Sequence, residues 1–438
     1  MTEALIGFAI LIVFVFLRIP IAFAMGLVGV AGFAFLSGWG PSLAMVGTRF
    51  SETALSYELS VVPMFILMGN LVSKAGLSAE LFGASHAFLG HRRGGLSMAT
   101  IVACGGFSAI CGSSLATAAT MSKVAYPEMR RYGYAESLST ASIAAGGTLG
   151  ILIPPSVILV IYGLMTETSI RELFAAGFLP GFLGILLYLC AVQFVVWRNP
   201  EAGPRVAKMD WVERMQALKG VWGTVLLFIL VIGGIYGGIF TPTEAAGVGA
   251  GGGFLLALAR GVRSFRDYFE VLVDSARTSA MLFTVLFGAM IFSNFVNRAG
   301  LPDGLLNMVT GFDVSPLVVI FIIVAIYIVL GCIFESLSML LLTIPIFFPV
   351  IKGLGYAGMG EEAILVWFGI VAVVVTEISL ITPPVGLNVF VLSGVLKDVK
   401  TTTVFKGVTP FWCVDIIRLM ILVFLPGLVM LLPNLLYR

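Results

Sequence analysis

The chain has 438 residues, of which 59% are hydrophobic and 11% are charged, and its mean hydropathy is +1.08. One soluble core cannot bury so large an apolar fraction, so the composition excludes a soluble globular protein and indicates a polytopic membrane protein. The net charge of +2, the two histidines and the five cysteines, which lie in apolar segments without ligand spacing, indicate neither a disulfide framework nor a zinc site.

Apolar segments that approach or exceed the length needed to cross about 30 Å of hydrocarbon recur along the whole chain. The first begins almost at Met1 and is followed by R-I-P, not by a small-residue cleavage site, so we expect it to remain as a span. The expected span cores are 5–17, 21–36, 61–72, 137–165, 173–196, 221–239, 245–259, 271–296, 363–396 and 408–432. Two further apolar stretches, 96–129 and 316–350, are each split near the middle.

Sequence markers recur in the same order in the two halves of the chain. The run V-S-K-A-G-L at 72–77 returns as V-N-R-A-G-L at 296–301, and the double proline at 154–155 returns at 383–384. Two further pairs follow the same order: Ser114 and Pro127 with Ser336 and Pro349, and Pro20 with Pro242. These markers predict two repeats, 1–197 and 221–438, joined by a cytoplasmic amphipathic linker at 198–220. The alternative is chance, since Gly and Pro are common in membrane helices.

Each half is expected to hold five crossings, one re-entrant helical hairpin and one proline-broken helix. The hairpins are expected at about 94–130 and 316–350, and the broken helices at about 137–165 and 363–396. An odd number of crossings inverts the second half relative to the first, which gives an all-α fold of two inverted-topology repeats. The charges beside the hairpins fit this topology: Arg92, Arg93, Arg130 and Arg131 flank the first, and Asp313, Lys352, Glu361 and Glu362 flank the second. Because basic residues collect on the cytoplasmic side, both termini are expected in the periplasm.

The four breaks are the candidate working parts. Helix ends at membrane depth expose carbonyl groups that suit Na⁺ and amide groups that suit carboxylates. The first hairpin tip, G-S-S at 112–114, offers hydroxyl N-caps to its second limb, and its partner break is G-G-T-L-G at 146–150. The second tip is G-C-I-F-E-S-L-S at 331–338, and its partner is T-E-I-S-L-I-T-P-P-V-G-L-N at 376–388. Together these segments predict an ion and anion site near the bilayer midplane.

Two carboxylates at membrane depth, Glu335 and Glu377, occupy positions that the repeat pairs with Ser113 and Thr148. An ionisable residue in such a place is costly and is a functional candidate by default. Glu335 and Glu377 either coordinate a cation or form capping or interhelical bonds, and the sequence leaves both open. Asp415 with Arg418, and Asp274 with Arg277, have i, i+3 spacing and are expected to pair structurally.

Four runs in this chain resemble the large membrane subunit of tripartite ATP-independent periplasmic (TRAP) transporters: G-S-S-L-A-T-A-A-T-M, L-I-P-P-S, E-S-L-S-M and E-I-S-L-I-T-P-P-V-G-L-N. The resemblance extends over essentially the whole chain. It implies an elevator-type transporter of the bacterial inner membrane that imports organic acids, such as C4-dicarboxylates or sialic acids, with a Na⁺ gradient. It also implies a small membrane subunit, expected as a separate chain because this one begins directly with a span, and a periplasmic substrate-binding protein.

The resemblance further implies Na⁺ near Ser113, Ser114, Gly147 and Gly150 in one half and near Glu335, Ser336, Thr382 and Gly386 in the other, with the substrate between the tips. Glu377 is a further Na⁺ candidate from its position in a broken span. The candidate substrate contacts are Ser113, Ser114, Thr148, Pro154, Ser336, Ser338, Pro383 and Asn388. We expect no organic cofactor and no nucleic acid partner.

Three other functions are alternatives. A self-sufficient Na⁺- or H⁺-coupled carboxylate symporter of similar design would need no partner subunits. A membrane-embedded enzyme is disfavoured because the sequence has no catalytic triad, phosphate loop or metal cluster. A passive channel is disfavoured because broken inverted repeats suit alternating access better than an open pore.

Overall fold

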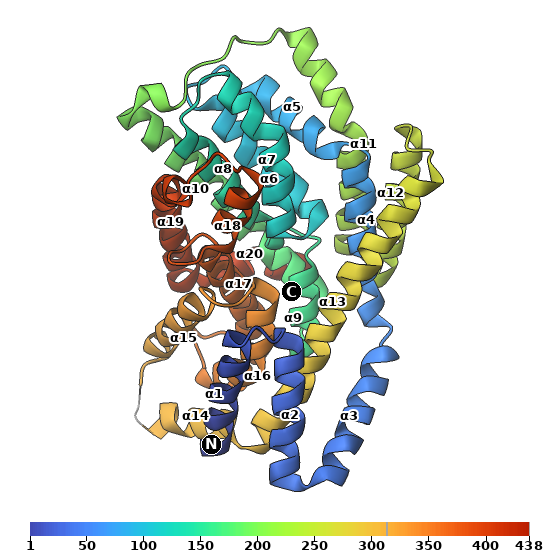
Figure 1. Ribbon diagram of the computed structural model, residues 1–438, viewed down its shortest axis with the longest axis vertical. Helices are drawn as coiled ribbons and strands as arrows, with labels where there is room; N and C mark the ends of the chain where they lie inside the picture. The colour runs from blue at the N-terminus through green and yellow to red at the C-terminus, as the bar shows by residue number, and fades with distance from the viewer. Residues whose placement is uncertain (312–313, 438) are drawn as a thin grey trace.

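The computed structural model describes residues 1–311 and 314–437, so Asp313, at one predicted hairpin mouth, lies outside the described residues. All regular elements in those ranges are helices (Figure 1). The α-helices are α1 Thr2–Phe16, α2 Ile21–Ser37, α3 Trp39–Ala54, α4 Val61–Lys74, α5 Leu77–Leu89, α6 Gly95–Cys111, α7 Ser114–Arg131, α8 Glu136–Thr148, α9 Val157–Thr166, α10 Ile170–Arg198, α11 Trp211–Tyr236, α12 Pro242–Ala259, α13 Phe265–Arg298, α14 Leu301–Gly311, α15 Pro316–Leu330, α16 Ser336–Leu354, α17 Glu361–Ser379, α18 Leu387–Val395, α19 Thr401–Phe424 and α20 Pro426–Tyr437. Three short 3-10 helices are η1 Glu58–Ser60, η2 Leu149–Ile151 and η3 Pro200–Ala202.

Six of these helices are long and apolar enough to cross a membrane: α10, α11, α13, α16, α17 and α19. A seventh span results if α3 and the segment Glu58–Lys74, which meet at an angle of 61°, are counted together. Shorter apolar helices, α1, α2, α6, α9, α15 and α20, add to the hydrophobic content. The chain is therefore a multi-pass membrane protein, as its composition predicts.

Helix breaks occur inside the stretches from which the hairpins and broken helices are predicted. Helices α6 and α7 are separated by only two residues, and α15 and α16 by five, at 331–335. Helix α8 is followed by η2 and then by α9, while α17 is followed by an irregular segment and then by α18. Both double prolines lie in these irregular segments, where the missing amide of proline does not interrupt a helix.

Two expectations differ from the structure. Helix α3 is not among the expected spans because its sequence carries Arg49, Ser51 and Glu52, which interrupt the apolar run. The linker expected at 198–220 is shorter in the structure. Its residues from Trp211 onward form the first turns of α11, which continues without a break to Tyr236.

Helix α13, 34 residues long, runs past several other helices (Figure 1). It packs against α4 near its beginning, where the Asn70 side-chain amide donates to the Ser275 hydroxyl over 2.9 Å. It packs against α2 near its end, where the Arg298 guanidinium donates to the Ser37 hydroxyl over 3.1 Å. Helix α13 therefore forms one continuous wall with α2 and α4.

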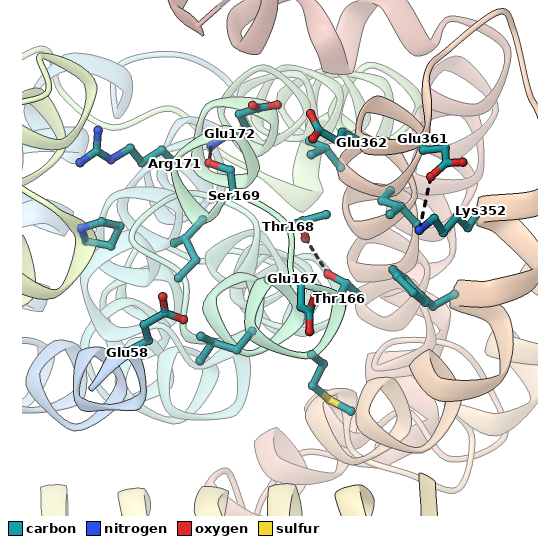
Figure 2. A pocket seen from close by; sticks show the side chains of 18 residues that line it. Glu58, Thr166, Glu167, Thr168, Ser169, Arg171, Glu172, Lys352, Glu361 and Glu362 are labelled. Atoms are coloured by element: carbon teal, nitrogen blue, oxygen red, sulfur yellow. Dashed lines mark hydrogen bonds and ion pairs between the residues drawn. The ribbon is translucent and has the colours of Figure 1, made fainter. Parts of the chain in front are cut away.

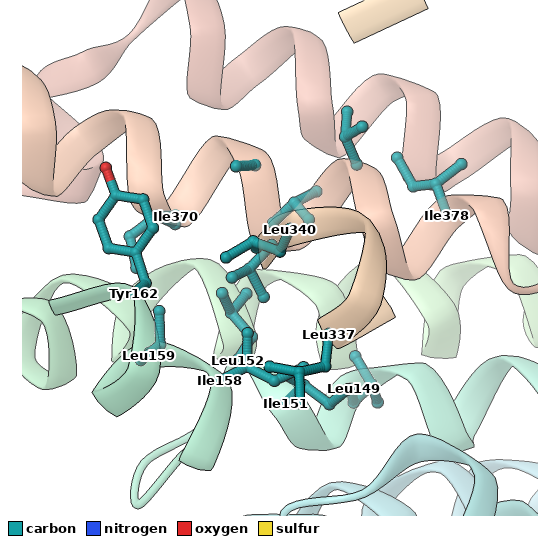
Figure 3. Packing of buried hydrophobic residues seen from close by; sticks show 14 of the residues in the cluster. Leu149, Ile151, Leu152, Ile158, Leu159, Tyr162, Leu337, Leu340, Ile370 and Ile378 are labelled. Carbon is teal, nitrogen blue, oxygen red and sulfur yellow. The ribbon is translucent and has the colours of Figure 1, made fainter. Parts of the chain in front are cut away.

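The two halves of the chain share one buried core. Side chains of the first break, including Leu149 and Ile151, lie beside Leu337 and Leu340 of α16, and Ile370 of α17 belongs to the same cluster (Figure 3). Because lipid tails are as apolar as leucine, van der Waals packing holds such contacts in a membrane, not the exclusion of water. The breaks of the first half are thus fixed in place by helices of the second.

Candidate functional site

The two hairpin tips line one cavity of about 830 Å³. The first tip contributes residues from Cys111 to Ala116, and the second contributes Glu335 to Ser338. The opposite wall comes from α2, α4 and α13, including Asn70 and Thr278. The cavity therefore lies between the hairpins and the wall formed by α2, α4 and α13.

The first tip turns sharply because Gly112 takes a left-handed conformation, with φ of +64°, directly after α6. Ser113 then caps α7, and its hydroxyl accepts from the Ala116 backbone amide at 3.3 Å, which confirms the predicted hydroxyl N-cap. Ser114, the first residue of α7, is 2% exposed. The tip therefore presents one capping hydroxyl and one buried hydroxyl.

The second tip is built in the same way with a different residue type. Glu335 is the N-cap of α16, and its carboxylate accepts from the Ser338 backbone amide at 3.4 Å. Ser336 follows it as the first residue of the helix and is 1% exposed. Within the described part of the chain, the Ser336 hydroxyl has no hydrogen-bond partner. Glu335 thus occupies the capping position that Ser113 holds in the first tip.

Glu377 connects the broken helix of the second half to the hairpin tip of the first. The Ser114 hydroxyl donates to Glu377 Oε2 over 2.8 Å, and the Glu377 side chain is 1% exposed. The second carboxylate oxygen, Oε1, has no partner among the described residues. A buried carboxylate with one hydrogen bond retains unused acceptor capacity.

Asn388, at the start of α18, makes a second connection between the halves. Its side-chain amide donates to the Ala144 carbonyl over 3.0 Å, and its Oδ1 has no partner in the described residues. A Cβ atom added to Gly147 would lie 3.1 Å from the Ser114 carbonyl oxygen and 3.3 Å from Asn388 Nδ2. Contacts of Ser114 and Asn388 therefore link four helices: α7 with Ser114, α8 with Gly147, α17 with Glu377 and α18 with Asn388.

Of the predicted site residues, only Ser113, Ser114, Glu335, Ser336 and Ser338 line the cavity; Gly147, Glu377 and Asn388 do not, and neither do the residues that follow here. The Thr382 hydroxyl donates to the Ile378 carbonyl and accepts from Trp412 Nε1, and a Cβ on Gly150 would overlap the Ser108 side chain. The other residues outside the cavity lining lie in the irregular segments or at helix ends: Thr148, Pro154, Pro383 and Gly386. Their assignment to Na⁺ or substrate stays a prediction.

Thr148 belongs to a separate buried network. Its hydroxyl oxygen lies 2.9 Å from that of Tyr188, which donates to Asp415 Oδ2 over 2.5 Å. Asp415 also pairs with Arg418 at 3.0 Å, with each side chain 1% exposed, which confirms the predicted i, i+3 pair. The predicted pair of Asp274 with Arg277 forms at 3.9 Å on an exposed surface.

Sequence reasoning missed the polar residues of the opposite wall. Asn70, Thr278 and Thr284 line the cavity from α4 and α13. Asn70 lies in the mostly apolar part of α4, and the two threonines lie in α13 among other polar residues. Polar residues in such positions more often serve helix packing than ligand binding. No sequence pattern distinguishes them.

A second, strongly polar hollow of about 1040 Å³ lies elsewhere on the protein (Figure 2). Its charged lining residues are Glu58, Glu167, Arg171, Glu172, Lys352, Glu361 and Glu362. Lys352 and Glu361, both expected beside the second hairpin, pair at 3.3 Å (Figure 2). The end of the second hairpin that lies opposite its tip is therefore next to this charged surface.

Comparison with known proteins bears on this geometry. The family model described as "Tripartite ATP-independent periplasmic transporter, DctM component" matches residues 8–428. The chain belongs to this family. The predicted resemblance to TRAP large permeases is therefore confirmed, and the family is one of transporter permeases.

Individual relatives agree along nearly the full length. The C4-dicarboxylate TRAP transporter large permease of Pseudomonas aeruginosa is 36% identical over 397 residues, covering 90% of each chain. The sialic acid TRAP transporter large permease of Vibrio cholerae is 32% identical over 386 residues, covering 87% of each chain. Among solved structures, the YdaH transporter of Alcanivorax borkumensis aligns with a TM-score of 0.63 at 16% identity, covering 89% of each chain. That structure supports the fold of this TRAP permease and nothing more.

Proposed function

We propose that this TRAP permease imports an organic acid across a bacterial inner membrane, coupled to a Na⁺ gradient. The observation that carries the proposal is the hydrogen bond between Ser114 and Glu377, beside a cavity lined by both hairpin tips. This bond joins a hairpin of one half to a broken helix of the other, so an ion bound there would affect both halves together.

Three buried oxygen atoms are of the type that binds Na⁺. Ser336 Oγ, Glu377 Oε1 and Asn388 Oδ1 are buried oxygens without partners among the described residues. Buried oxygens normally have partners, and hard cations take oxygen ligands. When bound, Na⁺ would supply positive charge near the tips, where a substrate carboxylate also meets the amide ends of α7 and α16. The side chains would hold the ion, and the helix ends would orient the acid.

An elevator movement of two inverted repeats accounts for the arrangement. The two tips are capped at equivalent positions, by Ser113 and Glu335, and the cavity separates them from α2, α4 and α13. We infer that the hairpins and broken helices move together against that wall. In this topology both termini lie in the periplasm and residues 198–210 lie in the cytoplasm.

The printed names of the relatives support a class of small organic anions or zwitterions. Large permeases named for C4-dicarboxylates, sialic acid and ectoine resemble this chain, and these compounds share a carboxylate group, whereas a further relative is named for isethionate, a sulfonate. We propose a carboxylate substrate delivered by a periplasmic binding protein, with a small membrane subunit beside this chain. The alternative is a self-sufficient Na⁺- or H⁺-coupled carboxylate symporter.

Uptake into proteoliposomes tests the proposal. Radiolabelled succinate, N-acetylneuraminate and ectoine are supplied with or without a Na⁺ gradient, the small subunit and the loaded binding protein. If uptake of one compound requires the Na⁺ gradient, the small subunit and the loaded binding protein, the result supports tripartite, Na⁺-coupled import. Uptake by this chain alone supports the self-sufficient symporter, and uptake indifferent to Na⁺ refutes the coupling.

Ser336→Ala tests the ion site independently of transport. Because the buried Ser336 hydroxyl has no partner, its removal should leave the apparent melting temperature in choline chloride unchanged or higher. The rise in melting temperature produced by NaCl should become smaller, since a ligand that binds the folded state stabilises it. Ser97→Ala is the matched control, because Ser97 is fully buried and far along α6 from the tip. An unchanged NaCl effect in Ser336→Ala would remove Ser336 from the site.

A further inference from the structure

Five basic side chains gather where the connection between α10 and α11 meets the turn between α5 and α6. They are His91, Arg92, Arg205, Lys208 and Arg214, and we call them the basic cluster. Partial burial first, and then the charges of the four other members, lower the pKa of His91. The segment that carries Arg205 and Lys208 is hydrogen-bonded through Val206 to Gly90, which precedes His91 and Arg92 in the chain.

The backbone under the cluster is held in place by hydrogen bonds. The Val206 amide donates to the Gly90 carbonyl over 3.2 Å, and the Gly94 amide donates to the Gly203 carbonyl over 2.9 Å. The connection is thus fixed to the turn before α6, although the two segments are far apart in sequence. The charges are presented by a preformed surface and not by a loose loop.

Arg214 packs against aromatic rings at one side of the cluster. Its guanidinium lies over the rings of Phe88 and Trp211, at 5.8 and 5.5 Å from their centroids. Its Nε and Nη2 atoms are buried, and neither has a hydrogen-bond partner within the described residues. The nearby acids Asp210 and Glu213 form the capping box of α11, and neither makes an ion pair with Arg214 among the described residues.

The other cations are also unpaired. Among residues 1–311 and 314–437, no ion pair includes Arg92, Arg205, Lys208 or Arg214. Arg92, Arg205 and Lys208 are exposed. Like charges held close to one another repel, so an anion that binds among them relieves a cost already present in the folded protein.

Exposed tryptophans place the cluster at the level of the lipid headgroups. Trp197, at the end of α10, is 79% exposed, and Trp211, at the start of α11, is 64% exposed. Tryptophan is enriched where a membrane helix meets water because its ring is apolar and its N–H is polar. Trp211 is itself one of the rings that contact Arg214. The cations therefore lie at the depth at which phospholipid phosphates are found.

We propose that the basic cluster binds the phosphate group of an anionic phospholipid, whose acyl chains lie along the exposed apolar surface of α10 and α11. Basic pockets at the ends of membrane helices bind anionic headgroups in this way. Both helices carry large exposed apolar side chains, among them Phe194 of α10 and Trp222 of α11, which are 51% and 64% exposed. A lipid satisfies both the phosphate position and this apolar surface, whereas a free phosphate satisfies only the first.

The test is lipid binding by the intact chain, purified in dodecyl maltoside and titrated with phosphatidylglycerol in native mass spectrometry. Each basic residue near an anionic lipid contributes about fivefold to affinity, so Arg205→Gln with Lys208→Gln should weaken binding roughly thirtyfold. Both side chains are exposed, so the variant should fold and keep its melting temperature. Arg263→Gln with Lys397→Gln is the matched control, because these cations are also exposed and lie on other connections.

Three outcomes would overturn the proposal. The control pair could lose as much affinity as the cluster pair, which would show general charge attraction. Phosphatidylcholine could bind as tightly as phosphatidylglycerol, which would show that the negative headgroup is irrelevant. Inorganic phosphate at millimolar concentration could displace the lipid completely, which would show a site for a water-borne anion.

Discussion

The hydrogen bond between Ser114 and Glu377 gives the most direct test of the ion site, through the variants Ser114→Ala and Glu377→Gln. The two atoms are 2.8 Å apart, and both side chains are at most 2% exposed. Loss of Ser114 leaves Glu377 without a hydrogen-bond donor among the described residues, because Oε1 is already unpartnered. A hydrogen bond to a charged group contributes about 1.5–3 kcal/mol, so its loss should be large enough to measure.

A double-mutant cycle separates this interaction from the individual substitutions. The apparent melting temperature of the purified chain is measured at increasing NaCl, with choline chloride keeping the ionic strength constant, and gives the Na⁺ affinity of each variant. Residues in direct contact show coupling of about 0.5–3 kcal/mol, so the double variant should be less impaired than the sum of the single variants predicts. We expect each single variant to weaken Na⁺ binding by about tenfold or more, at about 1.4 kcal/mol per tenfold.

The control is Ser97→Ala, at a fully buried serine of α6 whose hydroxyl donates to the Met129 sulfur over 3.7 Å. It should leave the NaCl effect unchanged. Strict additivity of Ser114→Ala and Glu377→Gln would refute the coupling that we derive from the hydrogen bond. Equal loss of the NaCl effect in Ser97→Ala would show that removing any buried hydroxyl from this hairpin weakens Na⁺ binding, and not the loss of the bond to Glu377.

Two further predictions concern stability, measured as the apparent melting temperature in detergent. Gly150→Ala should destabilise the folded protein by about 1–3 kcal/mol or more, because the new Cβ would overlap Ser108. The matched control Gly26→Ala has open space around the new Cβ and should be neutral or slightly stabilising. Equal melting temperatures of the two variants would refute the close packing at Gly150. Arg418→Met should cost about 3–5 kcal/mol by leaving Asp415 buried without its cation, and adding Asp415→Leu should recover most of that loss. A double variant as unstable as the sum of its single variants would contradict this account.

Local features of the site could be predicted from sequence because local chemistry determines them. Gly112 and Ser113 have the residue types that a tight turn and a helix cap need, and both take those roles. The predicted pairing of Asp415 with Arg418 is also found, because i, i+3 spacing brings the two side chains together on any helix.

Contacts between distant segments could not be predicted in the same way. The sequence predicts Thr148 as a substrate contact, and nothing in that prediction indicates that its hydroxyl lies beside that of Tyr188, from a different helix. The bond between Ser114 and Glu377 joins residues 263 positions apart, and nothing in either local sequence specifies the other. Which face of a helix meets which neighbour depends on the tertiary packing, and periodicity in a uniformly apolar helix does not reveal it.

The two carboxylates of the second half make different contacts, and this difference bears on how an ion would be coupled to movement. Glu335 caps its own helix, a task that the neutral Ser113 performs at the other tip, so capping alone does not require the charge. Among the described residues Glu335 forms no ion pair, although it lines the cavity. A carboxylate at membrane depth is costly without a compensating charge. A cation in the cavity would provide that compensation at Glu335, while Glu377 holds the opposite tip through Ser114. Release of the ion would then leave one carboxylate uncompensated, which favours a rearrangement of the tips over an empty site that keeps its shape.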